Sequence, residues 1–267
     1  MADSLLSFPP EVAPEDWDTI LRAVRHPEEH QVLRGSPLAR IYSPLINLSD
    51  LGRPFVFGQL GQSLDGRIAT PTGKSHFING LGAIRHLHRL RALADAVIVG
   101  VGTAIADDPL LTVRHVPGPN PARVIIDPAG RLPATARCLR DDGAQRIVLQ
   151  GRDVPRPPGI EALTLPSDGG KIAPASIIDA VGGLGFRRIL VEGGADTVSR
   201  FLDARLLDRL HLLVAPMIIG SGPTGIALGA IDGLADALRP RHAIYRFDDG
   251  DLLVDCDFSH VEGAPGP

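Results

Sequence analysis

The chain has 267 residues, of which 44% are hydrophobic and 22% charged, a composition typical of a soluble globular protein with a sizeable core. Its formal net charge of −4 excludes a global basic field that would recruit nucleic acid or an anionic membrane surface. The sequence shows no secretory signal, no apolar run near the roughly 20 residues of a membrane span, and two cysteines without metal-ligand or disulfide spacing, so we expect a cytoplasmic protein with no metal site.

Residues 1–52 differ from the rest and are predicted to form a partly helical N-terminal extension. An amphipathic helix is expected over residues 14–25, because apolar side chains recur at helical spacing on one face: Trp17, Ile20, Leu21 and Val24. Prolines then interrupt any long element, at Pro27, Pro37 and Pro44. The segment lacks the His-x-Glu and Pro-Cys-x-x-Cys signature of zinc deaminases, so we expect it to pack on the main domain or on a partner subunit.

Residues 53–260 are predicted to form one α/β domain in which strands alternate with helices. The predicted strands lie at residues 55–60, 96–99, 123–127, 146–149, 162–165, 188–191 and 209–215. Helices are expected at residues 79–94, 103–107, 174–181 and 196–202. This alternation implies right-handed crossovers and a mainly parallel sheet. Two later strands, at 243–247 and 252–258, are separated only by 248–251, which is typical of an antiparallel hairpin at the edge of such a sheet.

The most informative stretch is residues 188–200, where a buried strand, a glycine turn and a helix start follow one another. Gly193 and Gly194 allow a close backbone approach, and free N–H groups at the start of the helix face a bound anion. Glu192 stands at the carboxyl end of the strand, where open α/β sheets place ligands. The pattern favours a phosphate or pyrophosphate beside a carboxylate, and the alternative is an ordinary tight turn with a surface Glu.

Two other loops could line the same cleft. Residues 62–69, Gln-Ser-Leu-Asp-Gly-Arg-Ile-Ala, follow the opening strand, although a surface Asp-Gly turn has the same sequence character. Residues 99–103, Val-Gly-Val-Gly-Thr, can admit the phosphates of a dinucleotide, although the full Gly-x-Gly-x-x-Gly is absent. Thr103 and Asp107 lie one helical turn apart and could bind hydroxyls, and Arg114 is a candidate anion clamp.

The helix at 79–94 carries a run of histidines and arginines. His86 and His88 are two residues apart and therefore lie on different helix faces, which disfavours a metal site. Arg89 is interpreted as part of a solvated basic face. Arg91 shares its face with apolar residues and therefore needs an anionic partner, either a protein carboxylate or a ligand phosphate.

Taken together and in order, these motifs resemble the reductase domain of the riboflavin-biosynthesis deaminase/reductases and their stand-alone relatives. The matching motifs are Asp-Gly-Arg-Ile-Ala, Leu-Arg-Ala, Val-Gly-x-Gly-Thr-x-x-x-Asp-Asp-Pro-Leu-Leu-Thr-Val-Arg and Val-Glu-Gly-Gly. The resemblance covers residues 54–258, is strongest at 62–114 and 188–222, and does not extend to the first 50 residues. It implies a dihydrofolate reductase-like, three-layer α/β/α fold with a mostly parallel sheet and a C-terminal antiparallel hairpin.

The resemblance also implies an activity, the NADPH-dependent reduction of the ribosyl group of 5-amino-6-(5-phosphoribosylamino)uracil in riboflavin biosynthesis. Hydride would pass to the C1 carbon of the opened sugar, and the cofactor would supply it. The family match assigns Glu192 a catalytic role and places substrate positions at Ser75, Arg91, Leu111, Arg114 and Glu192. It places cofactor positions at Gly61, Phe77, Thr103, Asp107, Gly193, Gly194, Ala195, Asp196 and Thr197. The arginines suit a sugar phosphate, and the helix start suits the cofactor pyrophosphate.

Two departures from the family pattern leave alternatives open. The family's Ser-x-Trp-Ile-Thr stands here as residues 75–79, Ser-His-Phe-Ile-Asn, in which Phe77 keeps a stacking surface without the indole N–H. The family's polar residue after the acid of the strand at 123–127 is replaced by Pro128. The alternatives are a same-fold NADPH-dependent reductase of another pyrimidine or pterin-like compound and, in a different class, a non-catalytic nucleotide-binding module.

A homodimer is expected. The predicted strand at 208–216 and the apolar loop at 217–220 are more hydrophobic than a monomer edge needs, and exposed apolar patches often mark interfaces. The family resemblance also implies dimers.

Overall fold

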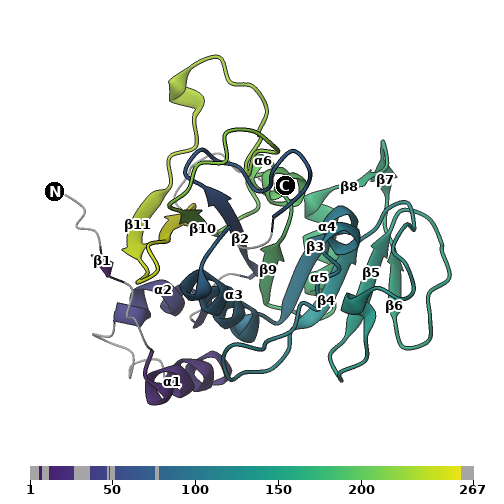
Figure 1. Ribbon diagram of the computed structural model, residues 1–267. Coiled ribbons are helices and arrows are strands. Elements are labelled where there is room, and N and C mark those ends of the chain that lie inside the picture. Colours follow the sequence, from purple (N-terminus) through teal and green to yellow (C-terminus); the bar gives the residue numbers. More distant parts are fainter. Residues whose placement is uncertain are drawn as a thin grey trace.

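The computed structural model describes residues 6–7, 12–26, 37–46, 48, 52–75 and 78–259. A ten-stranded sheet forms its centre, in the order β1-β11-β12-β10-β2-β9-β3-β4-β5-β6 (Figure 1). Its strands are β1 (Leu6–Ser7), β2 (Phe55–Ser63), β3 (Ala96–Gly100), β4 (Ala122–Ile126), β5 (Arg146–Gln150), β6 (Glu161–Thr164), β9 (Arg188–Glu192), β10 (Arg209–Ala215), β11 (Arg241–Arg246) and β12 (Leu252–Asp257). A separate ribbon, which the sequence did not predict, pairs β7 (Ser167–Asp168) with β8 (Lys171–Ile172).

The sheet is parallel apart from one strand, β12, which pairs antiparallel with both β10 and β11. The predicted mostly parallel sheet with a C-terminal antiparallel hairpin is therefore confirmed. β10 lies between β2 and β12 and is not an edge. The edge argument for the predicted strand at 208–216 is therefore wrong. The apolar side chains of β10 pack into the cores on both faces of the sheet, because Leu210 and Leu213 belong to different core clusters.

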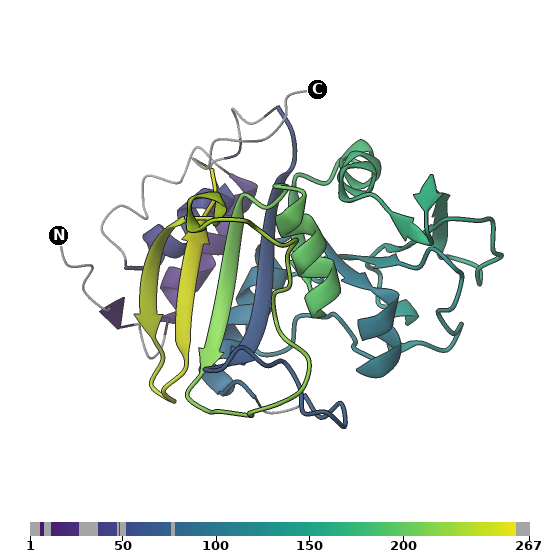
Figure 2. The same cartoon turned by 90° about the horizontal axis from the view of Figure 1, so that it is seen from above.

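Helices cover both faces of the sheet and produce three layers, as expected (Figure 2). One face carries α1 (Pro14–Arg25), α2 (Pro37–Ile46) and α3 (Leu81–Leu93), and the other carries α5 (Pro174–Gly183) and α6 (Ala195–Asp203). The short helix α4 (Val101–Ala106) follows β3, and 3-10 turns lie at η2 (Arg137–Leu139) and η3 (Leu234–Asp236). Side chains of β3 alternate between the two cores, since Val97 and Val99 join the first and Ile98 joins the second.

The described part of the N-terminal extension packs on the main sheet. α1 has the predicted bounds, but α2 was not predicted, because Pro27, Pro37 and Pro44 had been interpreted as interruptions. Pro37 lies in the first turn of α2, where a missing N–H costs little, while Pro44 lies within the helix. Buried side chains of both helices join the same core as Phe57 of β2 and Leu90 of α3, among them Trp17, Ile20, Ile41 and Leu45.

Arg188, the first residue of β9, connects both helices to the sheet. Its Nε donates to the carbonyl of Leu45 at 2.7 Å, and its Nη2 donates to the carbonyl of Val24 at 2.9 Å. These carbonyls lie in the last turns of α2 and α1, where a cation is favoured by the helix dipole and by otherwise unpaired carbonyls. β9 thus holds the N-terminal helices at its start and carries Glu192 at its end.

Arg89 corrects another expectation from the sequence. Its side chain is buried, and its guanidinium carbon lies 5.9 Å from the centroid of the Trp17 ring. The solvated basic face proposed for this part of α3 is therefore wrong, because α1 covers it.

Within the described residues, no helix combines the length and the apolar character needed to cross a bilayer.

Candidate active site

A groove lies at the carboxyl ends of β2, β9 and β3, where the loops that follow these parallel strands converge. Its central pocket has a volume of about 330 Å³. The predicted site residues that line this pocket are Gly61, Ser75, Thr103, Asp107, Leu111, Glu192, Gly193 and Gly194. Residues far apart in the sequence are therefore brought together as the motifs indicated. Phe77 lies outside the described residues, and Ala195 lines none of the groove pockets described here.

Arg91 on α3 and Glu192 at the end of β9 form a bidentate ion pair in this groove. Arg91 Nε donates to Glu192 Oε2 at 2.8 Å, and Arg91 Nη2 donates to Oε1. Arg91 Nη1 donates to the carbonyl of Thr112 at 3.0 Å. The two side chains are 6% and 11% exposed. The anionic partner of Arg91, which the sequence left open, is therefore a protein carboxylate, and the paired geometry fixes the direction of Glu192.

The turn between β9 and α6 has the features of an anion site. Gly193 has φ +123°, a conformation that side chains disfavour. The Gly194 amide donates to Thr103 Oγ1 at 2.9 Å, so the Thr103 hydroxyl holds the turn against α4. The first amides of α6, on Ala195 and Asp196, have no partner inside the helix and can donate to an anion.

The backbone of the same turn has no room for side chains at two glycines. A Cβ on Gly194 would stand 2.7 Å from Thr103 Oγ1. A Cβ on Gly100, at the end of β3, would stand 2.6 Å from Thr197 Oγ1. Both glycines therefore permit the close approach of backbone and hydroxyl that shapes this part of the groove. A neighbouring pocket on the far side of the turn includes the predicted cofactor residues Thr103, Gly194, Asp196 and Thr197.

Gly61 is small for a local reason. A Cβ there would stand 2.1 Å from Oδ1 of Asn79, the residue that replaces the family's Thr. Asn79 in turn donates through Nδ2 to Asp251 Oδ2 at 3.2 Å, and the Gly80 amide donates to the same oxygen at 2.8 Å. Gly61 therefore lets Asn79 fix the start of α3, the helix whose last turn carries Arg91.

A cationic pocket of about 270 Å³ adjoins the other end of the central one. Its lining includes Ser75, Asp107 and Leu111 together with Arg91, Arg114 and Arg137. Burial and the positive charges of Arg91 and Arg137 lower the pKa of the Arg114 guanidinium. Three arginines of which only Arg91 has a carboxylate partner among the described residues form a site suited to an anion.

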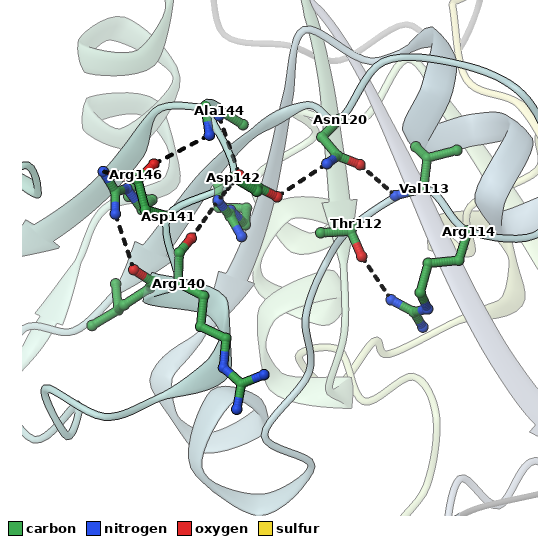
Figure 3. Close-up of polar contacts among 12 residues, drawn as sticks. Thr112, Val113, Arg114, Asn120, Arg140, Asp141, Asp142, Ala144 and Arg146 are labelled. Atoms are coloured by element: carbon green, nitrogen blue, oxygen red, sulfur yellow. Dashed lines mark hydrogen bonds and ion pairs between the residues drawn. The ribbon is translucent and has the colours of Figure 1, made fainter.

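The loop that carries Arg114 is anchored on both sides. Figure 3 shows the Arg114 side chain donating through Nη1 to Thr112 Oγ1, at 2.8 Å. The neighbouring Val113 amide donates to Asn120 Oδ1 at 2.8 Å, and Asn120 donates to Asp142 at 3.0 Å. On α3, His88 Nδ1 accepts from the Arg114 amide at 3.0 Å. The loop also holds Leu111 at φ +57°, a sparsely populated conformation for leucine that is typical of functional sites.

Arg137 was missed by the sequence analysis. Its backbone amide donates to Asp108 Oδ1 at 2.7 Å, which ties η2 to the motif that leads to Arg114. No periodicity marks an arginine in such a turn, and the only available signal was the Asp-Asp-Pro of the motif itself. Asp108 has φ +39°, so this contact is made from an unusual backbone conformation.

Other polar motifs proved to be structural. Asp65, of the 62–69 loop, accepts hydrogen bonds from Ser63 Oγ and from the amides of Ile219 and Gly220, and these bonds lower its pKa to about 2. It joins the loop after β2 to the loop after β10. His86 and His88 are both buried and have different partners. His86 is hydrogen-bonded to His211, and His88 accepts from the Arg114 amide. In the part of the chain that the structure describes, no group of three or more His, Cys, Asp or Glu side chains could hold a metal ion.

The three layers, the mostly parallel sheet and the groove at its carboxyl edge define an α/β protein of the dihydrofolate reductase-like class. Residues 54–243 match the family model described as the RibD C-terminal domain. The chain therefore belongs to the RibD C-terminal domain family, whose named relatives include reductases of riboflavin biosynthesis.

Individual relatives agree with this assignment. The chain is 35% identical to the 2,5-diamino-6-ribosylamino-4(3H)-pyrimidinone 5′-phosphate reductase of Methanothermobacter thermautotrophicus, over 70% of this chain and 90% of the relative. It is 35% identical to the riboflavin biosynthesis protein RibD of Aquifex aeolicus, over 71% of this chain but 53% of the relative. Among solved structures, RibD of Acinetobacter baumannii superposes with a TM-score of 0.70 at 26% identity, covering 86% of this chain and 68% of the other. The deaminase/reductase of Thermotoga maritima gives 0.68 at 29% identity, covering 86% and 62%.

Proposed function

We propose that the chain reduces the ribosyl group of 5-amino-6-(5-phosphoribosylamino)uracil to the ribitylamino product, with NADPH as the reductant, in riboflavin biosynthesis. The observation that carries this proposal is the order in which the functional groups follow one another along the groove. Arginines that suit a sugar phosphate lie at one end, the Arg91–Glu192 pair lies in the centre, and the Gly193–Gly194 turn lies beyond it. A phosphorylated sugar between two such ends would meet a bound nicotinamide in the central pocket.

Arg114 and Arg137 would bind the substrate phosphate, since their guanidinium groups can each donate two parallel hydrogen bonds. Arg91 would act indirectly, by holding the Glu192 carboxylate in place. The Glu192 carboxylate would accept hydrogen bonds from the pyrimidine ring or from ribose hydroxyls and so place the C1 carbon of the sugar. Ser75 and Leu111 would complete the substrate pocket.

The cofactor side of the groove would use the remaining predicted residues. The Gly193–Gly194 turn and the first amides of α6, on Ala195 and Asp196, would bind the pyrophosphate, and Thr103 would hold the turn in place. Gly61, Asp107, Thr197 and Phe77 would line the remaining surface, by family match. A bound nicotinamide cofactor supplies the hydride.

A second substrate is favoured by a specific observation. Two archaeal relatives, 35% and 33% identical, are named for the 2,5-diamino-6-ribosylamino-4(3H)-pyrimidinone phosphate, which carries an amino group where the uracil carries an oxygen. Both compounds present the same ribosyl phosphate to Arg114 and Arg137. The groove residues described here bind the shared part of the two compounds and do not separate them.

The test is NADPH oxidation with each pyrimidine as substrate, together with mass analysis of the product. We expect a product two hydrogens heavier, and loss of activity in a Glu192→Gln variant that still folds. Turnover only with a pterin-like or other pyrimidine compound would favour the broader same-fold reductase. Binding of nucleotides without any turnover would favour a non-catalytic module.

A cytoplasmic homodimer completes the proposal. Its support is a set of exposed apolar side chains after β10 and beside it: Leu64, Met217, Ile218, Leu228, Ile231 and Leu234. Ile218 and Leu234 are 76% and 78% exposed, more than isolated surface apolar residues require. Sedimentation of the full chain at micromolar concentration is the test, and a stable monomer would remove the dimer from the proposal.

A further inference from the structure

The segment 111–114, which carries Arg114 into the groove, is held by side chains and not by a neighbouring strand. Among the described residues, it forms no backbone–backbone hydrogen bond. Side chains bind the Thr112 carbonyl and the Val113 amide. The contact on the backbone of Arg114 itself comes from His88 on α3, whose Nδ1 accepts from the Arg114 amide at 3.0 Å. The place of Arg114 therefore depends on an imidazole.

The His88 ring is suited to this contact because it is neutral and firmly held. The side chain is buried, with 2% of its surface exposed, and the ring of His115 packs edge-on against it at 4.6 Å between centroids. Burial, together with the positive charges of Arg91 and Arg114, lowers the pKa of His88 to about 3. An Nδ1 that accepts from an amide carries no proton, so the proton of the neutral ring lies on Nε2.

His88 and Arg91 lie three residues apart and therefore share one face of α3. Arg91 holds the Glu192 carboxylate, and His88 holds the Arg114 backbone. Leu90, between them in the sequence, is fully buried in the core and anchors this part of the helix. A single turn of a packed helix therefore sets the position of Arg114 relative to Glu192.

We propose that His88 is a positioning residue for the substrate. It places Arg114 so that the guanidinium meets the phosphate while the Glu192 carboxylate meets the pyrimidine or the ribose. His88 lines neither the central nor the cationic pocket, so it acts through Arg114 and does not touch the substrate. This inference rests on the proposed function, because it takes Arg114 to bind the substrate phosphate.

The test is steady-state kinetics of the full chain with the phosphorylated and the dephosphorylated pyrimidine at saturating NADPH. His88→Leu removes the acceptor and frees the Arg114 backbone. We expect KM for the phosphorylated substrate to rise about tenfold, with kcat and the NADPH dissociation constant within about threefold of the parent values. KM for the dephosphorylated substrate should stay close to that of the parent, because this compound has no phosphate for the Arg114 guanidinium.

His88→Asn and His88→Gln form a matched pair that decides the question if His88→Leu does not fold. The amide oxygen of asparagine is bonded to Cγ, as Nδ1 of histidine is, and can accept from the Arg114 amide in the same place. The amide oxygen of glutamine lies one carbon further out. We expect the KM of His88→Asn to lie within about threefold of the parent value and that of His88→Gln to lie about tenfold above it.

A double-mutant cycle separates placement of Arg114 from general stabilisation of the fold. In an Arg114→Ala background, His88→Leu should raise KM by less than about twofold, because the guanidinium that His88 places is already absent. The matched control is His86→Leu. His86 is buried on the same helix, is hydrogen-bonded to His211 and lines neither pocket. Its replacement should lower the melting temperature without a rise in KM that depends on the phosphate.

The outcomes separate this inference from the proposed function. An unchanged KM in His88→Leu, or an equal rise for both substrates, would overturn the inference and leave the reductase function standing. Additive effects of His88→Leu and Arg114→Ala, or equal KM values in His88→Asn and His88→Gln, would also overturn it. Absence of turnover of either pyrimidine by the parent would overturn both proposals.

Discussion

His86 on α3 and His211 on β10 are hydrogen-bonded to each other in the protein interior, with Nε2 and Nδ1 2.8 Å apart. Both rings are fully buried, and the Tyr42 hydroxyl of α2 lies 3.0 Å from His86 Nδ1. Burial, with nearby positive charge, places the pKa of each imidazole well below its ordinary value. Asp255 lies 3.9 Å from His211 Nε2, beyond hydrogen-bond distance, and its carboxylate is engaged by Arg209. The pair is therefore neutral in the folded protein.

The first prediction follows from this neutrality. Unfolded histidine titrates near pH 6.5, so below that pH the unfolded state binds protons that the folded state excludes, and stability falls as pH decreases. Two histidines that stay neutral would together lower the free energy of unfolding by about 4 kcal/mol between pH 7 and pH 5. His88, whose pKa burial lowers to about 3, adds to the same trend.

Urea denaturation over this range measures the effect. His211→Asn keeps a polar atom near the Nδ1 position and removes one titrating group, so its stability should depend less steeply on pH than that of the parent. Asp255 acts in the opposite direction, because burial raises its pKa, and its effect on stability begins at its unfolded value near pH 4 and extends upward. An unchanged pH dependence in the variant would show that the histidine pair is not the cause.

The second prediction concerns Gly194→Val. Backbone strain is not the cause, because Gly194 has φ −53°, and the positive φ of this turn belongs to Gly193. The effect should come from contact instead, because a Cβ at Gly194 would stand 2.7 Å from Thr103 Oγ1 and displace the hydroxyl that holds the turn. We expect NADPH affinity to fall by about tenfold or more with a small change in melting temperature.

Cofactor titration beside a thermal melt tests this. Gly183→Val is the control, since a Cβ there meets nothing within 4 Å. Parent-like NADPH affinity in a folded Gly194→Val protein would show that the turn does not hold the cofactor.

The third prediction concerns Arg114→Lys. Lysine keeps the charge but loses the planar fork, so substrate affinity should fall by about tenfold or more, from the roughly 1.5–3 kcal/mol of a charge-assisted bond. NADPH affinity should change little, because Arg114 lies at the other end of the groove. Steady-state kinetics with phosphorylated and dephosphorylated substrate measure the effect, and the dephosphorylated compound should show little further loss. The control is Arg140→Lys, on an exposed arginine nearby. Undiminished discrimination between the two substrates in Arg114→Lys would assign the phosphate to other residues.

The fourth prediction concerns Arg188→Met. This change removes the hydrogen bonds to the carbonyls of Leu45 and Val24, in the last turns of α2 and α1. We expect the free energy of unfolding to fall by about 1–3 kcal/mol. Urea denaturation measures it, and Arg187→Met, at the exposed neighbouring position, should have little effect. Equal effects of the two substitutions would mean that the contacts to the helices do not stabilise the fold.

The sequence predicted those parts of the site that depend on local order. The strand, glycine turn and helix at 188–202 are present, and Glu192 stands where the pattern put it. The partner of Arg91 could not be chosen from the sequence, because Glu192 and a phosphate offer the same charge and Glu192 lies 101 positions away. Arg137 and Lys171 were missed for a related reason. Arg137 lies in a short 3-10 turn and Lys171 in a two-residue strand, both too short to show periodicity, and only the folded chain brings them to the groove.

The N-terminal helices show the same limit. Helical spacing of apolar residues predicted α1, whereas Pro44 argued against a helix at α2. The stability of α2 comes from packing of residues such as Ile41 and Leu45 on the sheet. The role of Arg89 was misjudged because the helix that covers it lies outside the family pattern. Tertiary burial decided these cases against local propensity.

The chain contains a single tryptophan, Trp17, and it lies in α1 with 3% of its surface exposed. Its indole Nε1 donates to the carbonyl of Pro117 at 2.8 Å, and its ring meets Tyr42 of α2 edge-on. Intrinsic tryptophan fluorescence is therefore an optical reporter of one event, the docking of the N-terminal helices. A red shift in its emission during denaturation would record their release from the sheet, and comparing it with cofactor binding would show whether this layer separates before the groove is lost.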